Sequence, residues 1–355
     1  MIFVADRDVG RNNNFNLVRM IAASGVLFSH AWPLALGKAT IEPLFTETGY
    51  KLGTTCVTIF FAISGFFITK SFENRVSISD FVLARIARIY PALVVVLLLT
   101  VFLLGPLFTT LSLQQYFSDR HTWTYLPRNL SLGMMQWQLP GVFTTNPGGD
   151  AINGSLWTLI REVSCYGLIA LAALMRLTKQ SLFPFVLVIL ALSVLFMQQS
   201  EGGGLLHSSS TLAFPFALGS AAYIYRRVVP LSAFLVFGLA FVAVILRSTA
   251  FYPLIHAAAL SYFALWCGFV RFPVIQIYNR LGDYSYGMYI YAFPVEQATI
   301  AIFPSLSPIQ LVLMSFPVTL LLSCLSWNWI ELPALAHRHV IAARIRLRRR
   351  QAEPS

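Results

Sequence analysis

Two ionisable side chains with catalytic potential lie in one apolar segment near the start of the sequence. Arg19 and His30 are 11 positions apart, so an α-helix would place them on nearly the same face, separated by about 16 Å along its axis. Charged or titratable groups inside long apolar segments are costly and point to function. The shared face favours a functional role for both Arg19 and His30. A snorkelling arginine and a hydrogen-bonded structural histidine are the alternatives.

A second polar pair, Arg161 and Glu162, interrupts the apolar segment that follows Trp157. Helix geometry places Glu162 about 12 Å below the outer end of that segment, a depth close to the one expected for His30. A carboxylate at this depth can orient an imidazole and raise its basicity. We therefore predict a catalytic Glu162, with Trp157 and Arg161 in substrate binding. The alternative is a structural Arg161–Glu162 ion pair.

The segment DYSYGMYIYAFPVEQ carries Tyr286 and Glu296 on either side of Pro294, which should kink or break a helix. Residue counting puts Glu296 at a depth similar to that of His30. Its tyrosines are suited to lining a hydroxyl-rich cavity, and we predict that Tyr286 and Glu296 bind substrate. The alternatives are an aromatic belt at the membrane interface for the tyrosines and, for Glu296, a catalytic role or a pair with a helix neighbour.

Two arginines suit the binding of a phosphate-bearing substrate, and one serine marks a point of close approach. Arg85 and Arg88 are one helical turn apart, and two forked guanidinium groups match the geometry of phosphate or pyrophosphate. Ser64 precedes Gly65, a point where a ligand or another helix can approach closely. The alternative for the two arginines is that they only anchor the helix at the cytoplasmic face of the membrane. The alternative for Ser64-Gly65 is packing in the protein core.

The composition defines the setting in which these residues act. Of 355 residues, 57% are hydrophobic and only 11% are charged, and the mean hydropathy is +0.70. A soluble domain carries about 25% charged residues, so a soluble enzyme, a disordered chain and a coiled coil are excluded. The apolar runs are continuous, which favours membrane-spanning helices over a β-barrel. The four cysteines lie in these runs without C-x-x-C spacing, so neither a disulfide framework nor a metal site is expected.

We predict an all-α fold, a polytopic membrane bundle of about ten transmembrane helices. The expected spans are roughly 16–36, 52–70, 87–108, 154–175, 182–199, 205–225, 230–247, 251–270, 284–303 and 309–330. With both termini cytoplasmic, 19 of the 25 Lys and Arg residues fall inside and 5 outside, while Arg161 lies within a span. This asymmetry follows the positive-inside rule and accounts for the net charge of +11 without nucleic acid.

The expected domains are a transmembrane domain over 1–335 and a basic cytoplasmic tail over 336–355, close to anionic lipid. The polar N-terminus lacks the charge order of a cleaved signal peptide. The longest loop, about 109–153, is external. It either lies along the membrane interface, forms a lid, or is a solvated connection.

Taken together, these residues resemble the acyltransferase-3 family of membrane acyltransferases. The matching patterns are R-x10-H at Arg19–His30, S-G-F at Ser64–Phe66, R-x-x-R-I-Y-P at Arg85–Pro91, S-L-W-T-L-x-x-E-x-x-x-Y at Ser155–Tyr166, G-x-x-S-Y-x-x-Y at Gly282–Tyr289 and E-x-P at Glu331–Pro333. They occur in order over nearly the whole chain. One departure is Ala292, which stands where many relatives have a histidine before Phe-Pro.

The resemblance implies an enzyme of the bacterial inner membrane that O-acylates, usually O-acetylates, an envelope glycan. Acetyl-CoA from the cytoplasm is the implied acyl donor, no metal is needed, and Tyr90 would join Arg19, Ser64, Arg85 and Arg88 in binding the donor. Implied acceptors are the O-antigen of lipopolysaccharide, exopolysaccharide, lipid-linked sugars and Nod-factor-like oligosaccharides.

His30 would act as general base, with a covalent acyl-histidine as the alternative. Because the chain continues for only about 25 residues beyond the last span, we expect the membrane domain itself to reach the acceptor. A homo-oligomer is left open. A secondary transporter or glycan flippase is the alternative function, and a non-catalytic subunit of a polysaccharide export complex is a further one.

Overall fold

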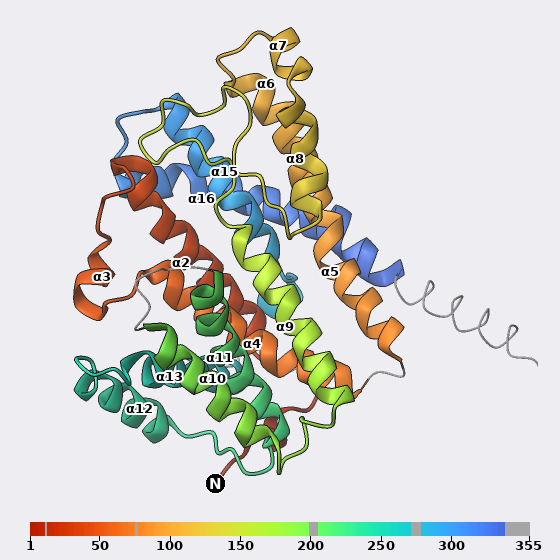
Figure 1. The fold of residues 1–355 in the computed structure, drawn as a ribbon, viewed down its shortest axis with the longest axis vertical. Coiled ribbons are helices and arrows are strands. Elements are labelled where there is room, and N and C mark those ends of the chain that lie inside the picture. Colours follow the sequence, from red (N-terminus) through yellow and green to blue (C-terminus); the bar gives the residue numbers. More distant parts are fainter. Residues whose placement is uncertain (11–12, 75–76, 199–204, 271–277, 338–355) are drawn as a thin grey trace, which may run out of the picture. The chain divides into compact units, whose positions relative to one another are not determined.

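The computed structural model describes residues 1–10, 13–74, 77–198, 205–270 and 278–337. In this part of the chain the secondary structure is helical, with two isolated β-bridges and no strand (Figure 1). The all-α prediction is thereby confirmed for the described residues. Most of the predicted basic tail, 338–355, lies outside them.

All ten apolar segments predicted from the sequence coincide with helices. These helices are α2 (Phe15–Leu36), α4 (Leu52–Glu73), α5 (Ile78–Leu99), α9 (Trp157–Leu174), α10 (Phe183–Gln198), α11 (Leu205–Ile224), α12 (Ala233–Ile245), α13 (Tyr252–Phe269), α15 (Ser285–Ile302) and α16 (Pro308–Ser326). The chief difference is at α5, which begins at Ile78 rather than near residue 87. Ser77 caps its first turn by accepting a hydrogen bond from the Asp80 backbone N–H, so Arg85 and Arg88 lie well inside a helix.

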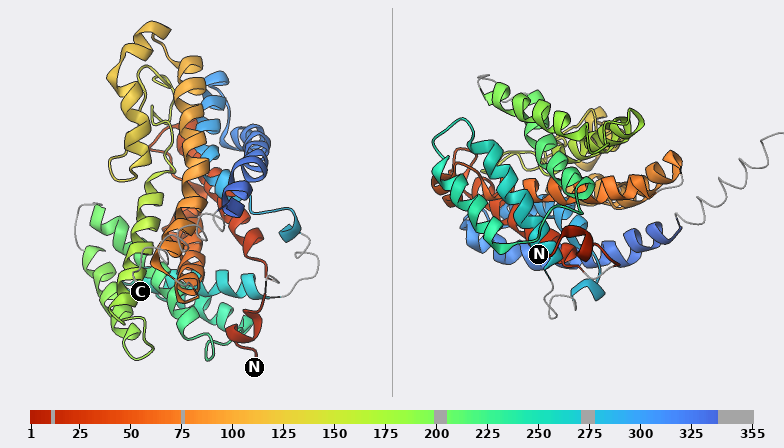
Figure 2. Two further views of the ribbon diagram at one scale, coloured as in Figure 1. Left: turned by 90° about the vertical axis from the view of Figure 1, so that its right-hand side faces the viewer. Right: turned by 90° about the horizontal axis from the view of Figure 1, so that it is seen from below.

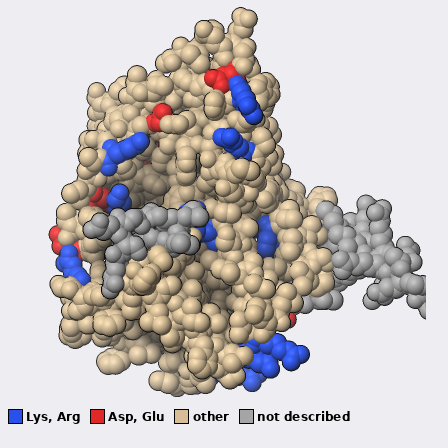
Figure 3. All heavy atoms as spheres, in the orientation of Figure 1, with Lys and Arg blue, Asp and Glu red and all other residues tan. Residues whose placement is uncertain are grey.

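Six helical segments among the described residues are long and apolar enough to cross a membrane. They are Phe15–Leu36, Leu52–Glu73, Ile78–Phe108, Trp157–Leu174, Tyr252–Phe269 and Pro308–His337. The third includes a π-helical stretch, η1 (Thr100–Leu104), and α6 (Gly105–Phe108), and the last includes a second π-helical stretch, η3 (Trp327–Glu331). Two helices, α10 and α12, are apolar but shorter. The surface in Figure 3 shows few charged side chains, as expected of a chain that faces lipid.

The described residues form two compact units, which we call unit 1 and unit 2. Unit 1 comprises the described parts of Met1–Val26, Glu42–Glu73 and Thr158–Gly282, and unit 2 comprises those of Leu27–Ile41 and Asn74–Trp157 together with 283–337. Helix α2 contributes its first half to unit 1 and its second half to unit 2. Arg19 and His30 thus lie on one continuous helix but belong to different units.

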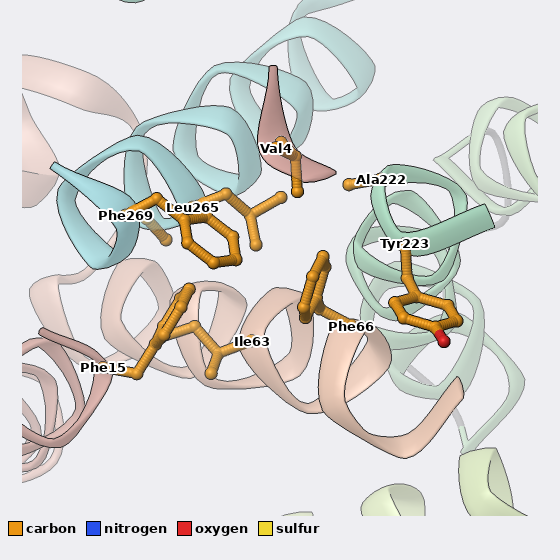
Figure 4. Close-up of a cluster of buried hydrophobic side chains, with 9 residues drawn as sticks. Val4, Phe15, Ile63, Phe66, Ala222, Tyr223, Leu265 and Phe269 are labelled. Carbon is orange, nitrogen blue, oxygen red and sulfur yellow. The ribbon is translucent and has the colours of Figure 1, made fainter. Parts of the chain in front are cut away.

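The core of unit 1 is an aromatic cluster beside a close helix crossing. Phe15, Phe66 and Phe269 pack with rings edge-on or stacked (Figure 4). Next to Phe66, a Cβ on Gly65 would lie 1.9 Å from the carbonyl oxygen of Phe216 on α11. Because only a residue without a side chain fits there, α4 and α11 approach backbone to backbone. The sequence left open whether a ligand or another helix approaches Ser64-Gly65. At Gly65 it is another helix, α11.

Unit 2 contains the whole of the loop 109–153, which is predicted to be external and which we call the external loop. The structure shows that this loop is folded. Ser112 caps helix α7 (Leu113–Ser118), and Asp119 caps helix α8 (Arg120–Leu130). Hydrogen bonds from the backbone and ring of His121 lower the pKa of Asp119. Helix α8 lies alongside α5 (Figures 1 and 2). The segment after α8 includes buried side chains at Asn146, Ile152 and Asn153, so a merely solvated connection is excluded.

Replacing Gly65 with alanine should destabilise the protein by about 1–3 kcal/mol, because the new methyl group overpacks the α4–α11 crossing. Thermal unfolding of the purified protein in detergent measures the change. Gly167→Ala is the matched control, since a Cβ there meets no atom within 4 Å and alanine is the better helix former. Equal unfolding temperatures for the two variants would contradict the crossing.

Candidate active site

The predicted site residues are distributed over both units, and each group is described within its own unit. Unit 1 contains Arg19, Ser64, Arg161 and Glu162. Unit 2 contains His30, Arg85, Arg88, Tyr90, Trp157, Tyr286 and Glu296. The predicted contact between His30 and Glu162 joins the two units and stays a prediction.

In unit 1 the structure brings two predicted residues together. The hydroxyl of Ser64 on α4 donates a hydrogen bond to Oε1 of Glu162 on α9 at 2.6 Å. The Tyr166 hydroxyl, one turn further along α9, donates to the same oxygen at 2.5 Å. Two hydroxyl donors thus stabilise and orient the carboxylate. The motifs S-G-F and S-L-W-T-L-x-x-E-x-x-x-Y meet in this contact.

Arg19 also contacts the S-G-F region. Its guanidinium group lies 5.3 Å from the centroid of the Phe67 ring, within the range of a cation–π interaction. The contact fixes the first half of α2 against α4.

In unit 2, Arg88 is the centre of an ionic network. Its Nη2 donates to Oδ2 of Asp283 at 2.5 Å, and its Nη1 donates to Oε2 of Glu331 at 3.4 Å. Each carboxylate is held by a serine, because Ser285 donates to Asp283 at 2.5 Å and Ser326 donates to Glu331 at 3.0 Å. Three motifs separated in sequence therefore converge on one guanidinium group.

Two aromatic rings complete the surroundings of Arg88. The guanidinium lies 5.8 Å from the ring centroid of Tyr286 and 5.7 Å from that of Trp327. The Tyr286 hydroxyl donates to the Ile89 carbonyl at 2.9 Å. The predicted acceptor-site residue Tyr286 is thereby placed beside the predicted phosphate site, on the link between α15 and α5.

Sequence reasoning did not single out Asp283, although it is the closest ionic partner of Arg88. Asp283 lies inside the G-x-x-S-Y pattern, at a position that the pattern leaves unspecified. The signal that could have identified Asp283 is a carboxylate two residues before Ser285, the serine of that motif. Ser326 and Trp327 precede the E-x-P pattern and were missed in the same way.

His30 faces helix α15. Its ring centroid is 5.1 Å from that of Phe293, with the rings nearly perpendicular. Phe293 is followed by Pro294, and a proline inside a helix leaves the carbonyl four residues earlier without its usual backbone donor. That carbonyl belongs to Ile290, and Asn153 of the external loop donates its side-chain amide to it at 2.9 Å.

The same loop is attached to α15 by a second set of amides. The Asn146 side chain donates to Oε1 and to the backbone oxygen of Gln297 at 2.8 and 3.0 Å. Gln297 in turn donates to the carbonyls of Gly149 and Ala151 at 2.8 and 2.7 Å. The carbonyls of Gly149 and Ala151 in this irregular stretch are thus satisfied by one side chain, Gln297, which Asn146 in turn holds.

Glu296, adjacent to Gln297, has an exposed fraction of 0%. Neither of its carboxylate oxygens has a hydrogen-bond partner among the described residues. No group of three or more His, Cys, Asp or Glu side chains is arranged to hold a metal ion in the described part of the chain.

The comparison with known families defines the class of protein. The family profile described as "Acyltransferase domain" matches residues 12–328. This range includes every motif of the two networks except E-x-P at Glu331–Pro333. The chain belongs to this family, the acyltransferase-3 family.

Two relatives resemble the chain over nearly its full length. An O-acetyl transferase of Shigella phage Sf6 is 30% identical over 341 residues, which cover 90% of this chain and 95% of the phage protein. Nodulation protein 10 of Rhizobium leguminosarum bv. viciae is 30% identical over 372 residues, which cover 94% of this chain and 96% of that protein. No solved structure matches the chain significantly.

The Arg88–Asp283 contact predicts the stability of variants. Asp283→Asn should destabilise the protein by about 1–3 kcal/mol, because a partly buried guanidinium loses a charged partner. Combining it with Arg88→Gln should cost less than the sum of the two single changes. Thermal unfolding in detergent measures all three. Glu47→Gln, at an exposed glutamate, should leave the unfolding temperature unchanged. Additive costs at Arg88 and Asp283 would contradict the pair.

Proposed function

We propose that this protein is a bacterial inner-membrane O-acyltransferase that transfers an acetyl group from cytoplasmic acetyl-CoA to a hydroxyl of an envelope glycan or lipid-linked sugar. The observation that carries the proposal is the similarity to the phage O-acetyl transferase along nearly the whole of both chains. Family membership and the phage relative's name favour the transferase over a transporter, a flippase or a non-catalytic subunit.

His30 is the general base in this proposal. Its imidazole removes the proton of the sugar hydroxyl as the oxygen attacks the thioester carbonyl. The C–S bond then breaks, and the imidazolium gives the proton to the departing CoA thiolate, so an ester and a thiol are formed. Base assistance of this kind contributes roughly 10²–10⁴-fold. The half-buried position of His30 on α2, with its ring against Phe293, supports a fixed imidazole.

The phosphates of acetyl-CoA bind Arg85 and Arg88, and Arg19 holds the donor further along its length. Two carboxylates and two rings fix the orientation of the Arg88 guanidinium. Because the carboxylates also compensate its charge, a phosphate at Arg88 has to compete with them, and Arg85 is the residue whose removal tests the donor site. Tyr90, two residues beyond Arg88, completes it. The spacing of Arg19 and His30 on continuous α2, about 16 Å, is comparable to an extended pantetheine arm.

The remaining predicted residues act on the acceptor or the reaction centre. Glu162, held by Ser64 and Tyr166, orients the imidazole or a sugar hydroxyl. Trp157 and Arg161 contribute to acceptor binding. A hydroxyl of Ser64 or Tyr286 is the candidate donor to the developing oxyanion.

The membrane topology belongs to the same proposal. Ten spans with both termini cytoplasmic place most Lys and Arg residues inside. The six helical segments of spanning length and the helices at the other four predicted segments support it. Arg85 and Arg88 then lie on the cytoplasmic side, where acetyl-CoA is available.

His30→Ala should reduce transfer by roughly 10²–10⁴-fold, because the attacking hydroxyl loses its base. The assay uses purified protein in liposomes, radiolabelled acetyl-CoA, and the glycan and lipid-linked sugar fraction of host cells lacking the gene. Label in that fraction measures transfer. His121→Ala is the matched control, since this histidine side chain is 69% exposed on α8. Wild-type rates for His30→Ala would refute the base, and failure of the wild-type protein to label glycan would refute the function. Trapped acetyl on His30 would indicate the covalent route.

Arg85→Gln should weaken donor binding through its phosphates. We expect the half-saturating concentration of acetyl-CoA to rise about tenfold, since a hydrogen bond to a charged group contributes about 1.5–3 kcal/mol. The preference for acetyl-CoA over acetyl-dephospho-CoA should shrink as well. The exposed Arg120→Gln on α8 serves as control. An unchanged donor dependence in Arg85→Gln would remove this residue from the donor site.

A further inference from the structure

Glu296 is an exception among the buried carboxylates of the described residues. Asp283 and Glu331 each accept hydrogen bonds from an arginine and a serine. Gln297 is equally buried, at 0% exposure, and its side-chain amide is fully engaged. Glu296 has no hydrogen bond to either oxygen. Burying an unpaired carboxyl costs on the order of several kcal/mol. A structural role therefore does not account for Glu296.

The contacts of α15 locate this carboxyl. Phe293, Glu296 and Ile300 are three and four residues apart and so share one face of the helix. Phe293 meets the ring of His30, and Ile300 packs in a buried cluster with Leu34. Both contacts are with α2, and the later residue on α15 contacts the later part of α2. Glu296 therefore lies between them, facing α2 at the depth of His30 to Leu34.

The external loop covers the same stretch. We call residues 146–154 the amide loop, because Asn146 and Asn153 attach it to α15. On its other side, a Cβ on Gly148 would lie 2.8 Å from the Cα of Leu34, so the loop backbone rests directly on α2. A Cβ on Gly154 would lie 2.5 Å from the ring of Phe293. The loop thus spans α2 and α15 around the contacts that flank Glu296.

We propose that Glu296 binds the acceptor through two neighbouring hydroxyls of a sugar, at a site that the amide loop covers until the acceptor enters. The inference rests on the proposed transfer to a sugar hydroxyl. A carboxylate presents two acceptor oxygens, which match two vicinal hydroxyl donors. With one hydroxyl beside His30, others on the same ring reach a carboxyl one helical turn from Phe293. The sugar supplies the partners that Glu296 lacks.

Glu296→Gln tests the binding role, since the amide keeps the shape but retains a single acceptor oxygen. At saturating acetyl-CoA, the half-saturating concentration of the glycan and lipid-linked sugar fraction should rise about tenfold. The half-saturating concentration of acetyl-CoA should not change. Glu47→Gln, an exposed glutamate on α3 (Pro43–Thr48), is the control. Unchanged acceptor dependence in an active Glu296→Gln variant overturns the inference, whereas an inactive wild-type protein overturns the proposed function instead.

A stability measurement separates binding from structure. Glu296→Leu removes an unpaired buried carboxyl, so the unfolding temperature in detergent should rise while acceptor transfer falls. A residue needed for the fold would give the opposite shift, and a lowered unfolding temperature would contradict the proposal.

Chemical modification tests whether the amide loop covers Glu296, and this test does not depend on acetyl transfer. Dicyclohexylcarbodiimide reacts with carboxyls in apolar surroundings, and peptide mass spectrometry locates the product. Asn146→Ala removes the two hydrogen bonds that Asn146 donates to Gln297 and so loosens the amide loop, which should accelerate modification of Glu296 severalfold. Equal modification rates in the variant and the wild-type protein would show that the loop does not cover this carboxyl.

Discussion

Polar groups in apolar surroundings must find their partners within the protein, and this constraint shapes both the fold and the site. The kink residue Pro294 leaves the Ile290 carbonyl without its helical donor, and Asn153 supplies one from a loop. Arg88 is accommodated by two carboxylates, which are themselves held by serines. Each polar residue therefore fixes the position of an element that the apolar surface alone would leave free to slide.

The parts of the fold that the sequence predicts are those set by local physics. Apolar length alone locates the helices, because about 20 apolar residues are required to cross a membrane. Helical periodicity places Arg19 and His30 on one face of α2, whose continuity over Phe15–Leu36 requires no tertiary information. The start of α5 was missed because Asp80 and Arg85 lower the hydropathy there. Its helix is set by the Ser77 cap and not by apolar character.

Tertiary pairing is the part that periodicity cannot supply. Depth along the membrane made Glu162 a partner for His30, yet many side chains share one depth, and the hydrogen bonds observed for Glu162 come from Ser64 and Tyr166. Asn146 and Gln297 are 151 positions apart, and nothing in either neighbourhood indicates the other. The motif patterns were more informative than depth, because Arg88, Ser285 and Glu331 each belong to one and do converge.

Helix α15 shows how one element serves structure and chemistry with adjacent residues. Gln297 is satisfied on both ends of its amide and holds the external loop, while Glu296 at the same burial is satisfied at neither oxygen. A fold selected only for stability would replace such a carboxyl with an apolar side chain, since the exchange removes a desolvation cost and no contact. The presence of Glu296 next to a fully paired glutamine, on the face that contacts the helix of His30, is therefore best explained by a partner that arrives with the substrate. Unsatisfied groups of this kind are expected where binding, rather than folding, completes the hydrogen bonds.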